Sequence, residues 1–99
     1  MSKQVSLSVN DMPIKLDLFV YGYIEHVVGG ILASLKDTEE IESLKLTIDN
    51  EGQVKIELNG SVIPLKPFPN EIIKSTVLGV VSPLKGVSGV NRLELTIDR

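Results

Sequence analysis

Residues 54–65 have the sequence VKIELNGSVIPL, and residues 5–16 have the related sequence VSLSVNDMPIKL. Each stretch begins with apolar side chains at every second position, which is typical of a strand with one buried face. An Asn-Gly pair at 59–60 and an Asn-Asp pair at 10–11 follow, and these residue types favour the positive φ angles of a tight turn. Both stretches therefore predict a β-hairpin with a short returning strand.

The likeness of the two stretches continues along the chain. Shifted by 49 positions, residues 5–49 align with residues 54–98 without a gap, and 15 of the 45 pairs are identical. The residues that recur 49 positions later are Val5, Asn10, Ile14, Leu16, Phe19, Ile24, Val28, Gly30, Leu35, Lys36, Leu44, Leu46, Thr47, Ile48 and Asp49. We interpret the chain as a tandem duplication of one ββαβ unit, fused into a single pseudo-twofold domain over residues 1–99.

A helix is predicted in each copy after the hairpin. In the first copy it spans about residues 19–35, with an apolar face spaced by three and four residues: Val20, Ile24, Val27, Val28, Ile31 and Leu35. The second helix begins at about Phe68. Pro69 is tolerated in its first turn, and Pro83 predicts an end near Val81 or Ser82.

Alternating strands close the two copies at residues 44–48 and 93–97. A tight turn at residues 49–52 predicts that strand 44–48 pairs antiparallel with strand 54–58. The repeat then predicts that strand 93–97 pairs with strand 5–9. We expect an α+β fold, a two-layer sandwich with two helices packed on one face of an antiparallel or mixed six-stranded sheet, whose complete strand order stays open.

Composition excludes several classes of protein. The chain of 99 residues has no cysteine, so disulfides and thiolate metal sites are excluded. Its net charge is −3 without a basic patch, which argues against nucleic acid as a partner. The most apolar segment, residues 19–35, is too short for a membrane span, and the start lacks the pattern of a secretory signal. We expect a soluble cytoplasmic protein.

The sequence offers no convergent set of catalytic or metal-binding residues. His26 is the single histidine, and its neighbour Glu25 would point about 100° away on a helix. The acidic residues Asp37, Glu39, Glu40 and Glu42 lack the spacing of a calcium loop and are interpreted as a solvated connection. We therefore predict no enzyme, no cofactor and no metal site.

At the start of the first helix the two copies differ in residues that could contact a ligand or a partner. Tyr21, Tyr23, Glu25 and His26 form a candidate ligand or partner surface there, with Tyr21 and Glu25 one turn apart. The plainer interpretation takes Phe19 and Phe68 as matched core anchors and puts Tyr21 on the helix surface.

Gly30 and Gly79 are equivalent positions inside the two predicted helices. Glycine in a helix interior costs about 0.5–1 kcal/mol relative to alanine, so a matched pair suggests a steric reason. We expect close approach of the two helices at these glycines. The alternative explanation is that another subunit packs against the helices at these glycines.

The hairpins and helix starts carry a family resemblance. Residues 9–16 lead to Phe19, and residues 58–65 lead to Phe68 before the step Leu84-Lys85-Gly86. They resemble a family of small uncharacterised archaeal proteins in which a V-N-G-x-x-I-P-L-N hairpin runs through Phe-Val into an apolar helix. Lys66 and Asp11 depart from that pattern. The resemblance implies an archaeal, cytoplasmic protein and brings no activity, catalytic residue or cofactor.

Two functional hypotheses follow. The first is a non-enzymatic scaffold or protein-interaction module that associates with itself, as a homodimer, or with a protein partner. The alternative is a small-molecule-binding protein that uses the start of the first helix. The sequence favours the first, because it combines a well-specified core with the absence of a catalytic set.

Overall fold

The computed structural model describes residues 4–35, 42–84, 87 and 89–98. The order of elements is strand, strand, helix, strand, and then the same again. The elements are β1 (Gln4–Val9), β2 (Met12–Ile14), α1 (Leu18–Leu35), β3 (Ser43–Ile48), β4 (Val54–Leu58), β5 (Ser61–Ile63), α2 (Pro67–Val81) and β6 (Leu93–Asp98). The two helices and the four long strands are present within two residues of their expected bounds. The returning strands end at Ile14 and Ile63, earlier than the alternation through Leu18 and Leu65 predicts.

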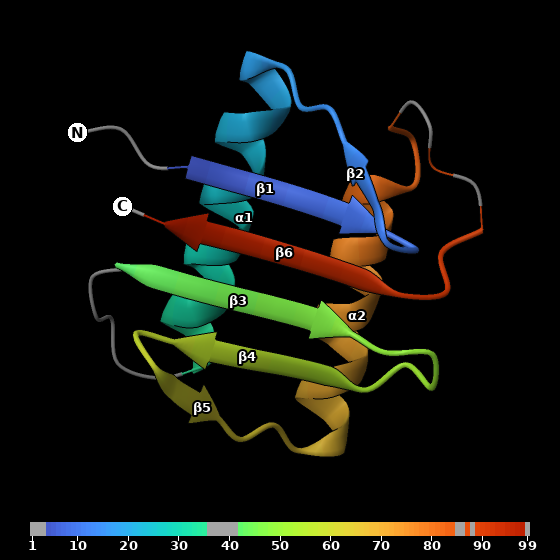
Figure 1. Ribbon diagram of the computed structural model, residues 1–99. Helices are drawn as coiled ribbons and strands as arrows, with labels where there is room; N and C mark the ends of the chain where they lie inside the picture. Colours follow the sequence, from blue (N-terminus) through green and yellow to red (C-terminus); the bar gives the residue numbers. More distant parts are fainter. Residues whose placement is uncertain (1–3, 36–41, 85–86, 88, 99) are drawn as a thin grey trace.

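The strands form one six-stranded sheet in the order β2-β1-β6-β3-β4-β5 (Figure 1). Every pairing is antiparallel, so the mixed alternative is wrong. The predicted pairing of β3 with β4 and that of β6 with β1 are both confirmed. The pairing that the sequence left open is the central one, between β3 and β6, where Leu46 lies opposite Leu95.

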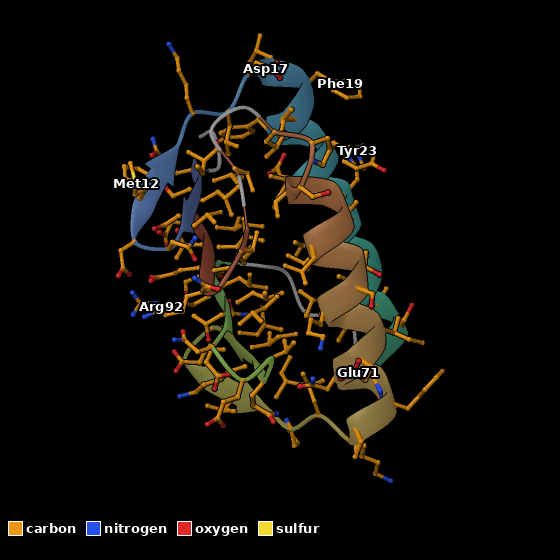
Figure 2. All side chains as sticks on the ribbon, turned by 90° about the vertical axis from the view of Figure 1, so that its right-hand side faces the viewer. Met12, Asp17, Phe19, Tyr23, Glu71 and Arg92 are labelled. Carbon is orange, nitrogen blue, oxygen red and sulfur yellow. The ribbon has the colours of Figure 1, made fainter. Side chains whose placement is uncertain are left out.

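Both helices cover the same face of the sheet, so the molecule has two layers (Figures 1 and 2). In the long strands every second residue is buried, which is the alternation that the sequence shows. The most deeply buried side chains come from both layers: Leu46, Ile56, Ile97, Val28 and Val81. The core is therefore the apolar space between one sheet face and one side of each helix.

Local signals explain where the helices begin and end. The Asp17 carboxylate accepts a hydrogen bond from the Val20 amide at 2.9 Å, as an N-cap residue does at the start of a helix. Helix α2 begins with a proline in its first turn and ends at Val81, two residues before Pro83. Ser82 still has helical angles, and its amide donates to the Leu78 carbonyl, but Pro83 has no amide hydrogen to continue this hydrogen-bond pattern, which is why the helix stops there.

Asparagines hold the two hairpin turns in place. Asn10 and Asn59 have positive φ angles of 53° and 51°, as a turn of the predicted type requires. The Asn10 side-chain oxygen accepts hydrogen bonds from the amides of Asn91 and Arg92, at 2.8 and 2.9 Å. The Asn59 oxygen accepts from the amides of Glu42 and Ser43, at 2.9 and 3.0 Å. Each hairpin turn is thereby hydrogen-bonded to the chain where a neighbouring strand begins, which is β6 for Asn10 and β3 for Asn59.

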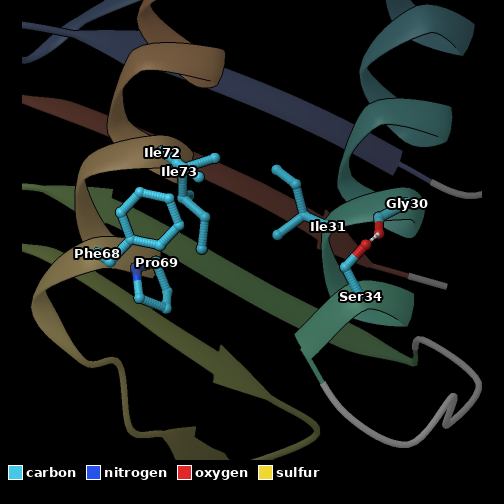
Figure 3. Close-up of a pocket in the computed structure, with 7 residues that line it drawn as sticks. All are labelled: Gly30, Ile31, Ser34, Phe68, Pro69, Ile72 and Ile73. Atoms are coloured by element: carbon cyan, nitrogen blue, oxygen red, sulfur yellow. Dashed lines mark hydrogen bonds between the residues drawn. The ribbon is translucent and has the colours of Figure 1, made fainter.

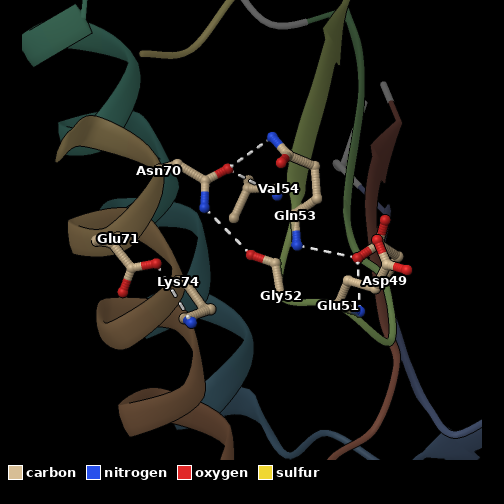
Figure 4. A network of polar contacts seen from close by, with 8 residues as sticks. All are labelled: Asp49, Glu51, Gly52, Gln53, Val54, Asn70, Glu71 and Lys74. Carbon is tan, nitrogen blue, oxygen red and sulfur yellow. Dashed lines mark hydrogen bonds and ion pairs between the residues drawn. The ribbon is translucent and has the colours of Figure 1, made fainter. Parts of the chain in front are cut away.

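A buried polar group connects α2 to the start of β4 (Figure 4). The Asn70 side-chain oxygen accepts from the Val54 amide at 2.8 Å and from the Gln53 side chain at 3.0 Å. Its nitrogen donates to the Gly52 carbonyl at 3.1 Å. In α1, the Tyr21 hydroxyl accepts from the Val5 amide at 3.1 Å and so connects that helix to β1. One side chain on each helix therefore holds the start of a strand that it packs against, β1 for Tyr21 and β4 for Asn70.

We predict that Asn70→Ala lowers the free energy of unfolding by about 1–3 kcal/mol, because the buried Val54 amide and the Gly52 carbonyl both lose their partner. Tyr21→Phe removes a single acceptor at a half-buried position and should cost about 0.5–1.5 kcal/mol. Urea denaturation measures both. Glu71→Ala, at an exposed ion pair, is the control, and an equal effect of Asn70→Ala and Glu71→Ala would contradict the assignment.

Candidate functional site

The four residues proposed at the start of the first helix do not form one site. Tyr21 faces the sheet, where its hydroxyl contacts β1, whereas Tyr23 is half-exposed on the opposite side of α1 (Figure 2). Successive helical residues are turned by about 100°, so residues 21 and 23 point in nearly opposite directions. A ligand therefore cannot contact both tyrosines at once through this stretch of helix.

The position of Tyr21 corrects the expectation that it lies on the helix surface. The ring is half-buried against the core, and the hydroxyl group completes the hydrogen bonding of the Val5 amide. A tyrosine supplies both apolar area and a polar tip, which suits a site where a helix meets the start of a strand. The structure gives Tyr21 a role in the fold.

His26 is exposed, and its Nδ1 atom lies 2.8 Å from the carbonyl oxygen of Gly22, one turn earlier. A carbonyl oxygen only accepts, so Nδ1 donates in this contact. Glu25 lies beside it in a half-buried position. In the part of the chain that the structure describes, no group of three or more His, Asp or Glu side chains is arranged to hold a metal ion.

Phe19 and Phe68 are not the core anchors that the sequence suggested. They are 77% and 72% exposed, and Figure 2 shows Phe19 on the side of α1 turned away from the sheet. The reason is helical geometry: α1 buries Ile24, and Phe19 stands five residues earlier, about 140° around the helix. Phe19 instead stacks on Tyr23, with ring centroids 5.9 Å apart.

The expected close approach of the helices at Gly30 and Gly79 is not what the structure shows. Both glycines are exposed, and a Cβ atom added to either would meet no atom within 4 Å. Apolar side chains fill the space between the helices and the sheet instead, leaving a gap of only ≈ 10 Å³ among Val27, Val28, Val77, Val80 and their neighbours. The glycines remain on the outer surface.

These glycines lie at two hollows in the outer surface of the helix layer. The Gly30 hollow has a volume of ≈ 410 Å³ and lies between the end of α1 and the start of α2 (Figure 3). Gly30, Ile31 and Ser34 line it from α1, and Phe68, Pro69, Ile72 and Ile73 line it from α2. Its walls are predominantly apolar.

The Gly79 hollow, of ≈ 460 Å³, lies between the start of α1 and the end of α2. Among its lining residues are Gly79, Val80 and Pro83, which follow Gly30, Ile31 and Ser34 by 49 positions. It is also lined by Phe19, Val20 and Tyr23, which precede Phe68, Pro69 and Ile72 by 49 positions. Each hollow thus has an exposed aromatic ring at one wall and a glycine at the other.

We call this surface the outer helix face and define it by Phe19, Tyr23, Gly30, Phe68, Ile72 and Gly79. Of the large apolar side chains that are exposed in the described residues, five lie on the helices: Leu18, Phe19, Tyr23, Phe68 and Ile72. Apart from the two tyrosines, the ionisable residues of the two helices are few, namely Glu25, His26, Glu71 and Lys74. Glu71 and Lys74 pair with each other at 3.4 Å. The outer helix face is apolar and close to neutral.

The exposed face of the sheet has the opposite character. Lys45 pairs with Glu94 at 3.7 Å, and Lys55 pairs with Glu57 at 3.5 Å. Arg92 forms an ion pair with Asp11. Such a charged surface is suited to water, so the two broad faces of the molecule differ sharply in polarity.

No protein-family model matches the chain, and neither the curated proteins nor the solved structures compared with it include a match. The resemblance to small archaeal proteins and the cytoplasmic location therefore stay predictions. Within the described residues, neither helix combines the length and the hydrophobicity needed to cross a membrane.

We predict that Gly30→Ala and Gly79→Ala each raise the free energy of unfolding of the dilute protein by about 0.5–1 kcal/mol. Alanine favours the helix, and open space surrounds both positions. Gly52→Ala is the contrasting variant, because Gly52 has a φ of +81° and its added Cβ would lie 3.1 Å from Lys74 Nζ. Gly52→Ala should lower stability by more than about 1 kcal/mol. Loss of stability in Gly30→Ala would show that the glycines are packing sites after all.

Proposed function

We propose that the protein is a non-enzymatic scaffold, built by duplication of a ββαβ unit, that acts by binding another polypeptide through its outer helix face. The observation that carries this proposal is the pair of apolar hollows, each beside an exposed aromatic ring, on a face with few charges. Large contiguous apolar patches are uncommon on monomeric proteins and mark sites of interaction.

Contacts that recur 49 residues apart support the duplication. The Tyr21 contact with Val5 and the Asn70 contact with Val54 join equivalent positions. The Asn10 and Asn59 contacts do the same at the hairpin turns. In the centre of the sheet Leu46 pairs with Leu95, its own equivalent, so the register between β3 and β6 is unchanged when the two copies are exchanged. A pseudo-twofold axis between these two leucines accounts for all of these relations.

The other surfaces are less suited to binding a protein. The sheet ends in β2 and β5, each of which has three residues, and Pro13 lies within β2. Short edge strands and proline discourage the addition of a further strand. The exposed face of the sheet carries ion pairs among its charged residues. The outer helix face is the broad surface where burial of apolar area can drive association.

Binding of a small apolar molecule is the second candidate function. The volumes of the two hollows, ≈ 410 and ≈ 460 Å³, lie in the range of about 300–1,000 Å³ that small-molecule sites occupy. Tyr23 lines the Gly79 hollow, so one of the four residues singled out from the sequence would contact such a ligand. Native mass spectrometry of the purified protein tests this candidate through any retained small mass.

The main proposal is tested by affinity capture with three forms of the chain. The tagged wild type is compared with Phe19→Asp/Phe68→Asp, in which both exposed rings become charged. The matched control is Met12→Asp/Val62→Asp, which adds the same charges at apolar residues that are 66% and 55% exposed on the edge strands. Bound polypeptides, untagged copies of this chain included, are quantified by mass spectrometry.

We predict that the amount of each polypeptide enriched by the wild type falls at least tenfold when Phe19→Asp/Phe68→Asp is used as bait. The Met12→Asp/Val62→Asp control should capture the same amount as the wild type. Tenfold corresponds to about 1.4 kcal/mol, a modest loss for two buried aromatic contacts in an interface. Equal recovery by the wild type and the helix-face variant would contradict the proposal. So would a wild type that enriches nothing above the tag alone.

A further inference from the structure

We infer that the polypeptide bound at the outer helix face is a second copy of this chain, packed helix layer against helix layer about a twofold axis. Phe19 and Phe68 of each copy would enter hollows of the partner copy. This inference rests on the proposed function and names the partner. Its first support is that protruding rings and matching hollows occur together on one surface.

A twofold interface brings the same patch of both copies together, so the patch must be complementary to itself. The outer helix face satisfies this condition, because it has two projections and two recesses. Phe19 and Phe68 project with 77% and 72% of their area exposed. Gly30 and Gly79 leave space where any other residue would place a side chain. A partner of unrelated shape would have no need of both features.

The hollows have room for a ring. Pockets of about 300–1,000 Å³ take whole small organic molecules, and the two hollows measure ≈ 410 and ≈ 460 Å³. A phenylalanine side chain is smaller than such a ligand. Its burial between the apolar walls removes roughly 150–250 Å² of aromatic surface from water, which is the kind of contact that dominates interface energies.

The area of the face is close to what a standard dimer interface buries. At 1.5 Å per residue, the 18 residues of α1 and the 15 of α2 are about 27 and 22 Å long. Side by side at a diameter of about 10 Å each, they cover roughly 500 Å² in flat projection. The projecting rings and the walls of the hollows add to the accessible area. The total thus approaches the roughly 800 Å² per partner of a standard interface, within a molecule 35 × 34 Å across its broad face.

Charge also favours a second copy over a strongly charged partner. The chain carries a net charge of −3, which would oppose self-association if it were spread over the contact surface. The helices contribute Glu25, His26 and the Glu71–Lys74 pair, whereas many charged side chains lie on the opposite face of the sheet. Two outer helix faces can therefore meet without burying a large charge of one sign.

The inference is tested by sedimentation velocity of the purified chain over a range of concentrations. We expect the wild type to be a dimer that dissociates on dilution. Phe19→Asp/Phe68→Asp should raise the dissociation constant at least tenfold. Both positions are second in their helices, where an acidic residue favours helix formation, so the fold should be kept. The Met12→Asp/Val62→Asp control should dimerise like the wild type.

A second variant fills the hollows without adding charge. Gly30→Leu/Gly79→Leu should also raise the dissociation constant at least tenfold, while the melting temperature of the dilute monomer stays the same or rises, because no atom lies within 4 Å of either added Cβ. A wild type that stays monomeric at every concentration would overturn the inference. So would dimers of both helix-face variants as tight as those of the wild type.

The result separates this inference from the proposal on which it rests. If the purified wild type is monomeric but Phe19→Asp/Phe68→Asp loses captured polypeptides, a different protein occupies the face. The dimer is then wrong and the association function stands. If the wild type is monomeric and this variant captures the same polypeptides as the wild type, both are wrong.

Discussion

The antiparallel pairing of β3 with β6 is the contact on which the other parts of the structure depend. It joins the closing strands of the two halves, with Leu46 and Leu95 opposite each other and both buried. β4 extends the sheet beyond β3, and β1 extends it beyond β6. Because residues 46 and 95 face the helix layer, both helices must cover that side. The sheet therefore determines where the helices lie, and it leaves their outer sides uncovered.

Much of this architecture follows from the sequence. Alternation of apolar residues placed the long strands, and Asn59-Gly60 placed a hairpin whose turn residues have the positive φ angles that its type requires. The turn at residues 49–52 and the repeat indicated two of the strand pairings. The order of strands could not be derived in full, because the contact of β3 with β6 joins segments far apart in the chain without a turn between them.

Which side of each helix is buried was harder to predict. Apolar spacing indicated a helix over residues 19–35 correctly, but several of its turns carry apolar residues on both sides, so spacing alone did not separate the core from the surface. Ile24, Val28 and Leu32 form the buried stripe, which leaves Phe19 and Tyr23 outside and turns Tyr21 inward. The stripe repeats every four residues, so the position four residues before Ile24 is Val20 and not Phe19. This count would have placed Phe19 outside the core.

The surroundings of Gly30 and Gly79 were also hard to predict from the sequence. Matched glycines in two helices suggested a close contact between them, yet no atom lies within 4 Å of a Cβ atom added at Gly30 or Gly79. A sequence shows that a side chain is missing but does not show on which side of the helix the space lies. In the structure the space is on the outside, next to exposed aromatic rings, and this places the candidate site on the outer helix face.

The packing of two such faces against each other is tested most directly by isotope-filtered NMR on a mixture of labelled and unlabelled chains. We predict intermolecular contacts between the ring protons of Phe19 or Phe68 in one copy and protons beside Gly30 or Gly79 in the other. Intermolecular contacts confined to the sheet face or to the edge strands would contradict this arrangement, as would their complete absence at concentrations where the chain is associated.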